Sequence, residues 1–188
     1  MEKLIKDFQR RFTYLEKEDF EQLLVLARME QLQKGEFFSK AGDYSHKIGI
    51  IQEGLVRGYL VDYEGREITT MFREESKVIG AYDTLFLDRP TNHYIQAMEN
   101  VNFLSLSMLD IRKIENPRIQ RCVLNITEEI LVLTIKRTES LTLLSPLERY
   151  LNFVKNRGAL INRIPQKYLA SYLGVTPQSF SRLKRRIK

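Results

Sequence analysis

The side chains best suited to chemistry lie near the end of the sequence, in residues 164–188. Gln178 and Arg182 are four residues apart, so one face of a helix would present both. Arginine can bind guanine through two hydrogen bonds and glutamine can bind adenine, at base edges exposed in the major groove of DNA. Hydroxyl and basic side chains around this pair are suited to phosphate contacts. They are Thr176, Ser179, Ser181, Lys184 and Arg185, followed by Arg186.

The same segment meets the local requirements of two helices joined by a tight turn. Ala170 is small enough for a close helix crossing, and Gly174 suits a turn with positive φ. Thr176 can cap the second helix, and Pro177 suits its first position. The expected core of this helix-turn-helix consists of Leu169, Ala170, Leu173, Gly174, Val175, Phe180 and Leu183. An ordinary helical hairpin is the alternative, but the polar and basic second helix favours DNA recognition.

The charge distribution agrees with a polyanion-binding end. From residue 140 onward, Glu148 is the only acid against ten basic residues, which gives that part a net charge of +9. The remaining residues carry −3, since the whole chain carries +6. A basic segment attached to a mildly acidic body is typical of nucleic-acid binding, whereas a merely solvated tail would not need the helix-turn-helix pattern.

The elements before this segment are predicted from periodicity. Residues 15–30 place Phe20, Leu23, Leu24 and Ala27 at helical spacing, which predicts a short amphipathic helix. Short runs rich in Ile, Val, Tyr and Phe then predict a sandwich or barrel-like β-domain over 33–107. The runs are 47–52, 55–62, 67–73, 93–99 and 102–107, with a hairpin turn expected at Tyr63-Glu64-Gly65-Arg66.

A long helix is predicted from Pro117 onward. Its apolar residues alternate steps of four and three, a spacing typical of a coiled-coil seam. The predicted dimer seam is Ile119, Val123, Ile126, Ile130 and Leu133. A second apolar stripe, available to pack on the β-domain, is Leu124, Leu131 and Ile135. Burial of every one of these residues in one monomer is the alternative, but two apolar faces need two partners, which favours a dimer.

A further helix is expected after this one. Ser145 can cap it and Pro146 suits its first position. Gly158 is expected to close it. Its predicted buried face is Leu147, Tyr150, Leu151 and Val154.

Several classes of protein are disfavoured by what the sequence holds. Cys122 is the single cysteine, which excludes a disulfide within the chain and a four-cysteine metal site, and it is expected to be a small buried apolar residue. His46 and His93 are the only histidines, and no catalytic constellation is visible, so we expect neither an enzyme nor a bound cofactor or metal. No apolar run is long enough for a membrane span and the N-terminus lacks a signal-type apolar region, which predicts a cytoplasmic protein with no membrane partner.

The whole chain resembles the Crp/Fnr family of bacterial transcription regulators. The resemblance rests on KGEFFSKAGDYSHKIGIIQEGLVRGYLVDYEGREI and on ASYLGVTPQSFSRLKRRI. It implies an α+β fold: an N-terminal double-stranded β-helix (jelly-roll-like and cyclic-nucleotide-binding-like) over 1–116, a dimerisation helix with linker over 117–144, and a C-terminal helix-turn-helix domain over 145–188. It also implies a homodimer that binds double-stranded DNA, with RNA polymerase as a further partner.

Within the family, positions matching Gln178 and Arg182 contact bases, and those matching Thr176 and Ser179 contact phosphates. The family's arginine at the start of the recognition helix falls on Pro177, so one base contact is expected to be missing. The sequence stops just after this helix, and the wing-like hairpin of many members is expected to be absent or nearly so.

The effector side departs further from the family pattern. Members that bind cyclic AMP carry a Gly-Glu-Leu element for the ribose and an Arg-Ser-Ala element for the phosphate. Here Ala81 and Tyr82 follow Gly80, and Thr91-Asn92-His93 stands in place of Arg-Ser-Ala. A buried phosphate without that arginine loses a bidentate partner, so cyclic AMP is not expected to bind usefully unless Arg89 substitutes through a shifted loop. The candidate pocket for an unidentified small-molecule effector is Gly80, Ala81, Tyr82, Arg89, Asn92 and His93.

Two other classes remain as alternatives. A cupin-type protein shares a similar β-architecture, but its metal site needs clustered His and Glu residues, and bulk metal analysis would test it. A regulatory subunit that binds protein through its C-terminal helices is disfavoured because protein interfaces are rarely so strongly basic, and salt-dependent DNA retention would test it.

Overall fold

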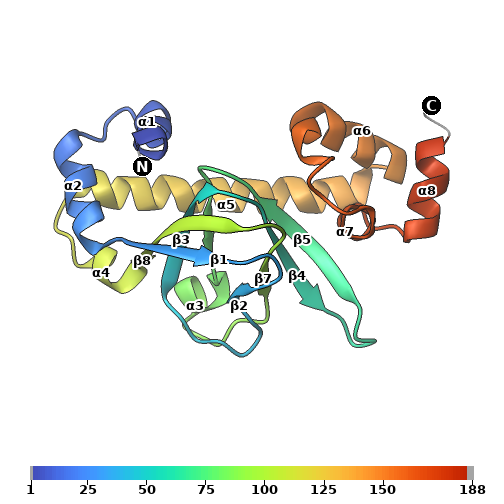
Figure 1. The fold of residues 1–188 in the computed structure, drawn as a ribbon, viewed down its shortest axis with the longest axis horizontal. Helices are drawn as coiled ribbons and strands as arrows, with labels where there is room; N and C mark the ends of the chain where they lie inside the picture. The colour runs from blue at the N-terminus through green and yellow to red at the C-terminus, as the bar shows by residue number, and fades with distance from the viewer. Residues whose placement is uncertain (1, 186–188) are drawn as a thin grey trace. The chain divides into compact units, whose positions relative to one another are not determined.

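The computed structural model describes residues 2–185, with side chains from Leu4 onward, so Arg186 and Lys188 lie outside the described residues. Figure 1 labels the elements. The strands are β1 (Arg28–Leu32), β2 (Phe37–Ser39), β3 (Lys47–Glu53), β4 (Val56–Val61), β5 (Glu67–Arg73), β6 (Val78–Gly80), β7 (Tyr94–Ala97) and β8 (Val101–Ser107). The helices are α1 (Glu2–Arg11), α2 (Lys17–Leu26), α3 (Tyr82–Leu87), α4 (Met108–Arg112), α5 (Pro117–Leu143), α6 (Pro146–Arg157), α7 (Gln166–Tyr172) and α8 (Pro177–Arg185), with a 3-10 turn at Gly158–Leu160.

The chain divides into two compact units. Unit 1 comprises Met1–Gly58 and Phe72–Glu128, and unit 2 comprises Tyr59–Met71 and Glu129–Lys188. The predicted division at residues 116 and 144 follows the element boundaries and stays a prediction. None of the helices described is long and apolar enough to cross a membrane.

The strands form two four-stranded sheets, in the orders β1-β8-β3-β6 and β2-β7-β4-β5. The pairs β1–β8, β3–β8, β3–β6 and β2–β7 are antiparallel. The predicted turn after β4 is confirmed, because the amide of Gly65, at a φ of 79°, donates to the carbonyl of Asp62 at 3.0 Å. The two sheets together with the long α5 confirm the expected mixed fold of a β-roll and a long helix.

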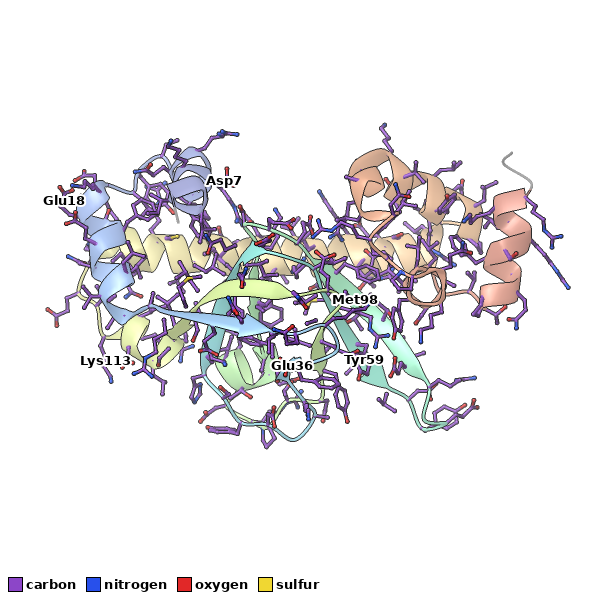
Figure 2. All side chains as sticks on the ribbon, in the orientation of Figure 1. Asp7, Glu18, Glu36, Tyr59, Met98 and Lys113 are labelled. Carbon is purple, nitrogen blue, oxygen red and sulfur yellow. The ribbon has the colours of Figure 1, made fainter. Side chains whose placement is uncertain are left out.

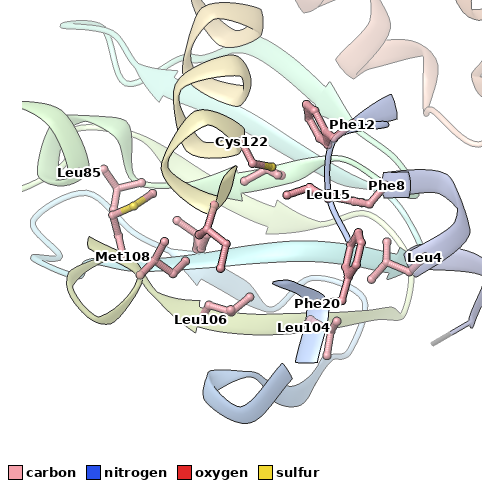
Figure 3. Packing of buried hydrophobic residues seen from close by; sticks show 14 residues of the cluster. Leu4, Phe8, Phe12, Leu15, Phe20, Leu85, Leu104, Leu106, Met108 and Cys122 are labelled. Carbon is pink, nitrogen blue, oxygen red and sulfur yellow. The ribbon is translucent and has the colours of Figure 1, made fainter. Parts of the chain in front are cut away.

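A large apolar cluster in unit 1 joins the N-terminal helices to one sheet and to the start of α5 (Figure 3). Phe8 and Phe12 lie in it at a ring-centroid distance of 5.7 Å. Cys122 is buried there, as expected, and burial raises the pKa of its thiol to about 11. The cluster surrounds a cavity of about 80 Å³ that is lined almost wholly by apolar side chains.

The structure corrects the predicted N-terminal helix. The helix predicted over 15–30 ends at Leu26, because residues 28–32 form β1 and pair with β8, Arg28 lying opposite Ser105. Pairing with a distant strand therefore overrides the helical periodicity there. The short strands β2 and β6 and the helix α3 were also not predicted.

Unit 2 contains the C-terminal helices. Ser145 caps α6 in a capping box with Glu148, as its sequence indicated. The predicted buried face of α6 is wrong in three of its four residues, because Phe153 is the buried residue of this helix and Tyr150 alone of the predicted set is half-buried. The predicted residues Leu147, Leu151 and Val154 are exposed, since the helix turns Phe153 and Tyr150 toward α7 and α8, in edge-to-face contact with Tyr172 and Phe180.

Candidate nucleic-acid interface and effector site

The turn between α7 and α8 has the geometry that its residues predicted. Gly174 has a φ of 70°, in the left-handed region that favours glycine. Its amide donates to the carbonyl of Ser171 at 3.0 Å, and the amide of Val175 donates to the carbonyl of Ala170 at 3.1 Å. Ala170 is fully buried at the crossing. The chain therefore leaves α7 and enters α8 through a tight turn with satisfied backbone hydrogen bonds.

The predicted core of the helix-turn-helix is brought together. Leu169, Ala170, Leu173 and Phe180 are buried, and Val175 and Leu183 are half-buried. The ring of Phe180 meets that of Tyr150 on α6 edge-to-face, with centroids 5.3 Å apart. This packing fixes which face of α8 is left outside.

The face of α8 that points to solvent carries the residues predicted to contact DNA. Gln178, Ser179, Ser181, Arg182 and Arg185 are exposed. Lys184 is half-buried, with its ammonium 5.7 Å from the ring centre of Phe180. Figure 2 shows nitrogen-tipped side chains projecting from this helix. The sequence holds no acid after Glu148, so this surface is uniformly basic.

The N-terminus of α8 is held by Thr176. Its hydroxyl accepts a hydrogen bond from the amide of Ser179 at 3.2 Å, the N-cap that the sequence predicted. The same hydroxyl lies 3.0 Å from the hydroxyl of Ser179. Both side chains are exposed, so two hydroxyls stand at the start of the recognition helix where a phosphate could be bound.

Arg149 links the C-terminal ends of two helices in unit 2 and was not singled out from the sequence. Its Nε donates to the carbonyl of Leu173 at the end of α7, at 2.8 Å. Its Nη1 donates to the carbonyls of Leu144 at 2.7 Å and Leu141 at 3.3 Å, at the end of α5. A cation at two helix C-termini is favourable because the carbonyls there lack partners within the helix.

The candidate effector residues surround a carboxylate that sequence reasoning missed, Asp83 in α3. Arg89 donates to Asp83 Oδ1 through Nη2 at 2.8 Å and Nε at 3.3 Å. His93 Nδ1 lies 3.2 Å from Oδ2, and the main-chain amide of Asn92 donates to Oδ2 at 3.3 Å. Partial burial opposes ionisation of Asp83, but the hydrogen bonds from Arg89 and His93 outweigh it and lower its pKa to about 2. The only sequence signal for this cluster was an acid that is followed six residues later by an arginine and ten residues later by a histidine.

The other three candidate effector residues are buried or half-buried. Ala81 is buried, and a Cβ on Gly80 would stand 2.7 Å from a methyl group of Leu85. The hydroxyl of Tyr82 is buried, and this burial raises its pKa, while Arg73 acts in the opposite direction. The structure thus joins Arg89, Asn92 and His93 through Asp83, whereas Gly80 and Ala81 are buried and Tyr82 is half-buried with its hydroxyl inside.

The predicted dimer seam on α5 is corrected in its first half. Ile119 is buried in the core of its own unit, and Val123 and Ile126 pack against that core. Ile130 is half-buried and Leu133 exposed. The stripe expected to pack on the β-domain is the one left open instead: Leu124, Leu131 and Ile135 are 56%, 59% and 49% exposed. The first half of the predicted seam packs in the core that the N-terminal helices help to form, which the spacing alone could not reveal.

Comparison with known proteins identifies one domain of the chain and several similar proteins. Residues 29–116 match the model of the cyclic nucleotide-binding domain. The chain is 24% identical over 180 residues to the fumarate and nitrate reduction regulatory protein of Vibrio cholerae, covering 85% of this chain and 68% of that one.

Solved structures share the fold. FixK2 of Bradyrhizobium japonicum matches with a TM-score of 0.76 at 16% identity, over 86% of this chain and 84% of that one. A transcriptional regulator of the Crp/Fnr family from Eubacterium rectale matches with a TM-score of 0.72 at 14% identity, over 93% and 84%. Residues 29–116 therefore carry a cyclic nucleotide-binding domain, and the proteins most similar in sequence and fold among those compared include regulators of the Crp/Fnr type.

Proposed function

We propose that this regulator binds double-stranded DNA as a homodimer through α8, and that cyclic AMP is not its effector. The observation that carries the DNA-binding part is the exposed, acid-free face of α8, set on a buried helix-turn-helix core. In this proposal Gln178 and Arg182 contact base edges. Thr176, Ser179, Ser181, Lys184 and Arg185 contact the backbone phosphates.

The dimer rests on the apolar stripe of α5. Leu124, Leu131 and Ile135 follow one face of a helix, and each is about half exposed or more. A row of large apolar side chains on a long helix is typical of a face that packs on a second helix. Two copies joined there place two recognition helices at half-sites about 34 Å apart on a near-palindromic site.

The protein acts by binding, without catalysis, in the bacterial cytoplasm, where its DNA lies. RNA polymerase is the further partner proposed, because a transcription regulator has to alter its recruitment or progress. Residues 80–93 form the effector side of the regulator, and an effector there would shift the population of two arrangements of the DNA-binding helices.

Selection from a random DNA pool tests the proposal. The purified protein is incubated with the pool at near-physiological salt, and bound DNA is recovered by gel shift and sequenced. Enrichment of a two-fold symmetric site supports a DNA-binding dimer. Recovery of no motif, with retention that vanishes as salt rises, contradicts sequence-specific binding.

Analytical ultracentrifugation tests the dimer separately. Leu131→Asp places a charge in the exposed stripe and is expected to shift the protein toward monomers. Leu151→Asp, on the exposed face of α6, is the matched control and should leave the assembly unchanged. A wild-type protein that sediments as a monomer at micromolar concentration, or a Leu131→Asp variant that stays dimeric, contradicts the proposed seam.

A further inference from the structure

The loop after α3 directs an unusual number of hydrogen-bond donors at one carboxylate. Besides Arg89, His93 and the amide of Asn92, the hydroxyl of Thr91 lies 3.3 Å from Asp83 Oδ2. A guanidinium, an imidazole, a hydroxyl and a main-chain amide therefore converge on a single group. The Asp83 side chain is only 11% exposed as a result.

The loop that carries these donors is firmly anchored. Thr91 is fully buried, its amide donates to the carbonyl of Asp43 at 2.9 Å, and its carbonyl accepts from the amide of Gly42 at 2.8 Å. The hydroxyl of Thr84, one residue beyond Asp83, donates to the carbonyl of Arg89 at 2.9 Å. These bonds do not involve the Asp83 carboxylate, so the loop has support that would persist without it.

Proteins bind phosphate groups with the same kinds of hydrogen-bond donor. Carboxylate and phosphate oxygens both accept charge-assisted hydrogen bonds from guanidinium, and Arg binds either through two nitrogens. Main-chain amides and hydroxyls commonly complete such sites. A carboxylate attached to the same chain is always present, so a free anion has to displace it before it can bind.

We propose that Asp83 is a built-in anion that fills a phosphate-binding loop formed by Arg89, Thr91, Asn92 and His93. The latent ligand is a small molecule with a phosphate monoester or diester, and Asp83 excludes it from the wild-type protein. In this proposal the Asp83 carboxylate takes the place of the ligand's phosphate when no effector is present. The assignment rests on the proposed function only in placing residues 80–93 on the effector side of the regulator.

Isothermal titration calorimetry with inorganic phosphate and with cyclic AMP tests the inference. Asp83→Ala is expected to bind at least one of the two about tenfold more tightly than the wild type, because Arg89 and His93 lose their internal partner. Adding Arg89→Ala to Asp83→Ala should abolish the gain. The matched control is Asp88→Asn, which removes an exposed acid just beyond the same helix and should gain nothing.

Several results would overturn the inference. They are a folded Asp83→Ala variant that gains no affinity, a double variant that keeps the gain, an equal gain in Asp88→Asn, or a wild type that already binds phosphate tightly. If Asp83→Ala does not fold, an NMR titration of the wild-type protein with phosphate tests the inference instead. Addition of phosphate should leave the Arg89 and His93 side-chain signals in place, and a saturable shift would contradict the inference.

The test is separable from that of the proposed function. Affinity for the selected DNA site, measured by fluorescence anisotropy without any ligand, should be retained by the wild type and unaffected by added phosphate or cyclic AMP at constant ionic strength. No gain of anion binding together with intact DNA binding refutes only the role of Asp83. Loss of all site-specific DNA binding refutes the proposed function, whatever the calorimetry shows.

Discussion

Two acids of unit 1, Asp19 and Asp83, are held by basic partners, whereas Arg182 and Arg185 on α8 in unit 2 face solvent. In unit 1, Asp19 is fully buried against Arg118, and Asp83 is enclosed by Arg89 and His93. In unit 2, Arg182 and Arg185 are exposed, and no acid follows Glu148 in the chain. The difference separates two uses of charge: in unit 1 it fixes the conformation of the chain itself, and in unit 2 it stays available for a polyanion.

The largest effect is expected from removing the support beneath the exposed cations. Phe180 is 1% exposed and packs on Tyr150, so Phe180→Ala should destabilise the helix-turn-helix by about 3–5 kcal/mol and abolish DNA binding. Thermal and urea unfolding measure the first effect, and gel shift measures the second. Leu151→Ala, on the exposed face of α6, is the control and should be nearly neutral. Similar stability of the two variants would show that Phe180 is not part of a tight core.

The internal charge pairs of unit 1 predict a dependence of stability on pH. The hydrogen bonds from Arg118, at 2.7 and 3.2 Å, are the main cause that lowers the pKa of Asp19 to about 2. Because this pKa is lower in the folded than in the unfolded state, the stabilisation is complete above about pH 4 and is lost as the pH falls toward 2. It amounts to about 2 kcal/mol.

Urea unfolding between pH 2 and pH 6 measures this effect. Asp19→Asn should lower stability at pH 6 and flatten the acid dependence. Glu18→Gln is the control at the neighbouring exposed residue, whose side chain projects outward in Figure 2, and it should leave the profile as in the wild type. An unchanged profile in Asp19→Asn would contradict the role of the Arg118 pair.

The exposed cations of α8 are expected to divide by role. Arg182→Ala should weaken binding to the selected site by about 1–3 kcal/mol and relax preference at one base position. Lys184→Ala should weaken binding to all DNA about equally and reduce the salt dependence. Neither change should alter the thermal stability of the protein by much, because the Arg182 side chain is exposed and the Lys184 ammonium lies as far as 5.7 Å from the ring centre of Phe180. Competition assays with random DNA separate the two, and identical behaviour would mean that the assigned roles are wrong.

The smallest effect is expected at the start of α8. Thr176→Ala removes the hydroxyl that accepts from the amide of Ser179, which should cost about 1 kcal/mol of stability. Thr176→Ser keeps the hydroxyl and should restore most of it, as measured by urea unfolding. Equal free energies of unfolding for Thr176→Ser and Thr176→Ala would show that the cap makes no measurable contribution to stability.

Features that depend on a few neighbouring residues could be predicted from the sequence. The positive φ of Gly174, the caps Thr176 and Ser145, and the turn at Gly65 each follow from local chemistry. The core of the helix-turn-helix was also predicted, because its apolar positions are set by two short helices and one turn.

Features that depend on distant partners could not be predicted. Residues 28–30 fall within the predicted helix, yet they pair with β8 more than seventy residues away. Ile119 is buried in a core that includes residues of the N-terminal helices, and nothing in the spacing of its apolar stripe shows this. Nothing in the sequence distinguishes Asp83 from the other acids, because only the folded loop brings Arg89 and His93 to its carboxylate.

Arg149 couples the local unfolding of two helix ends in unit 2. One guanidinium binds carbonyls at the end of α5 and at the end of α7, so neither end can fray without giving up a bond to the same side chain. We therefore expect the amides of the last turn of α5 and those of α7 to exchange with deuterium at similar rates, as a single cooperative opening unit. A lysine at this position, with one nitrogen in place of a planar fork, would let the two ends exchange independently.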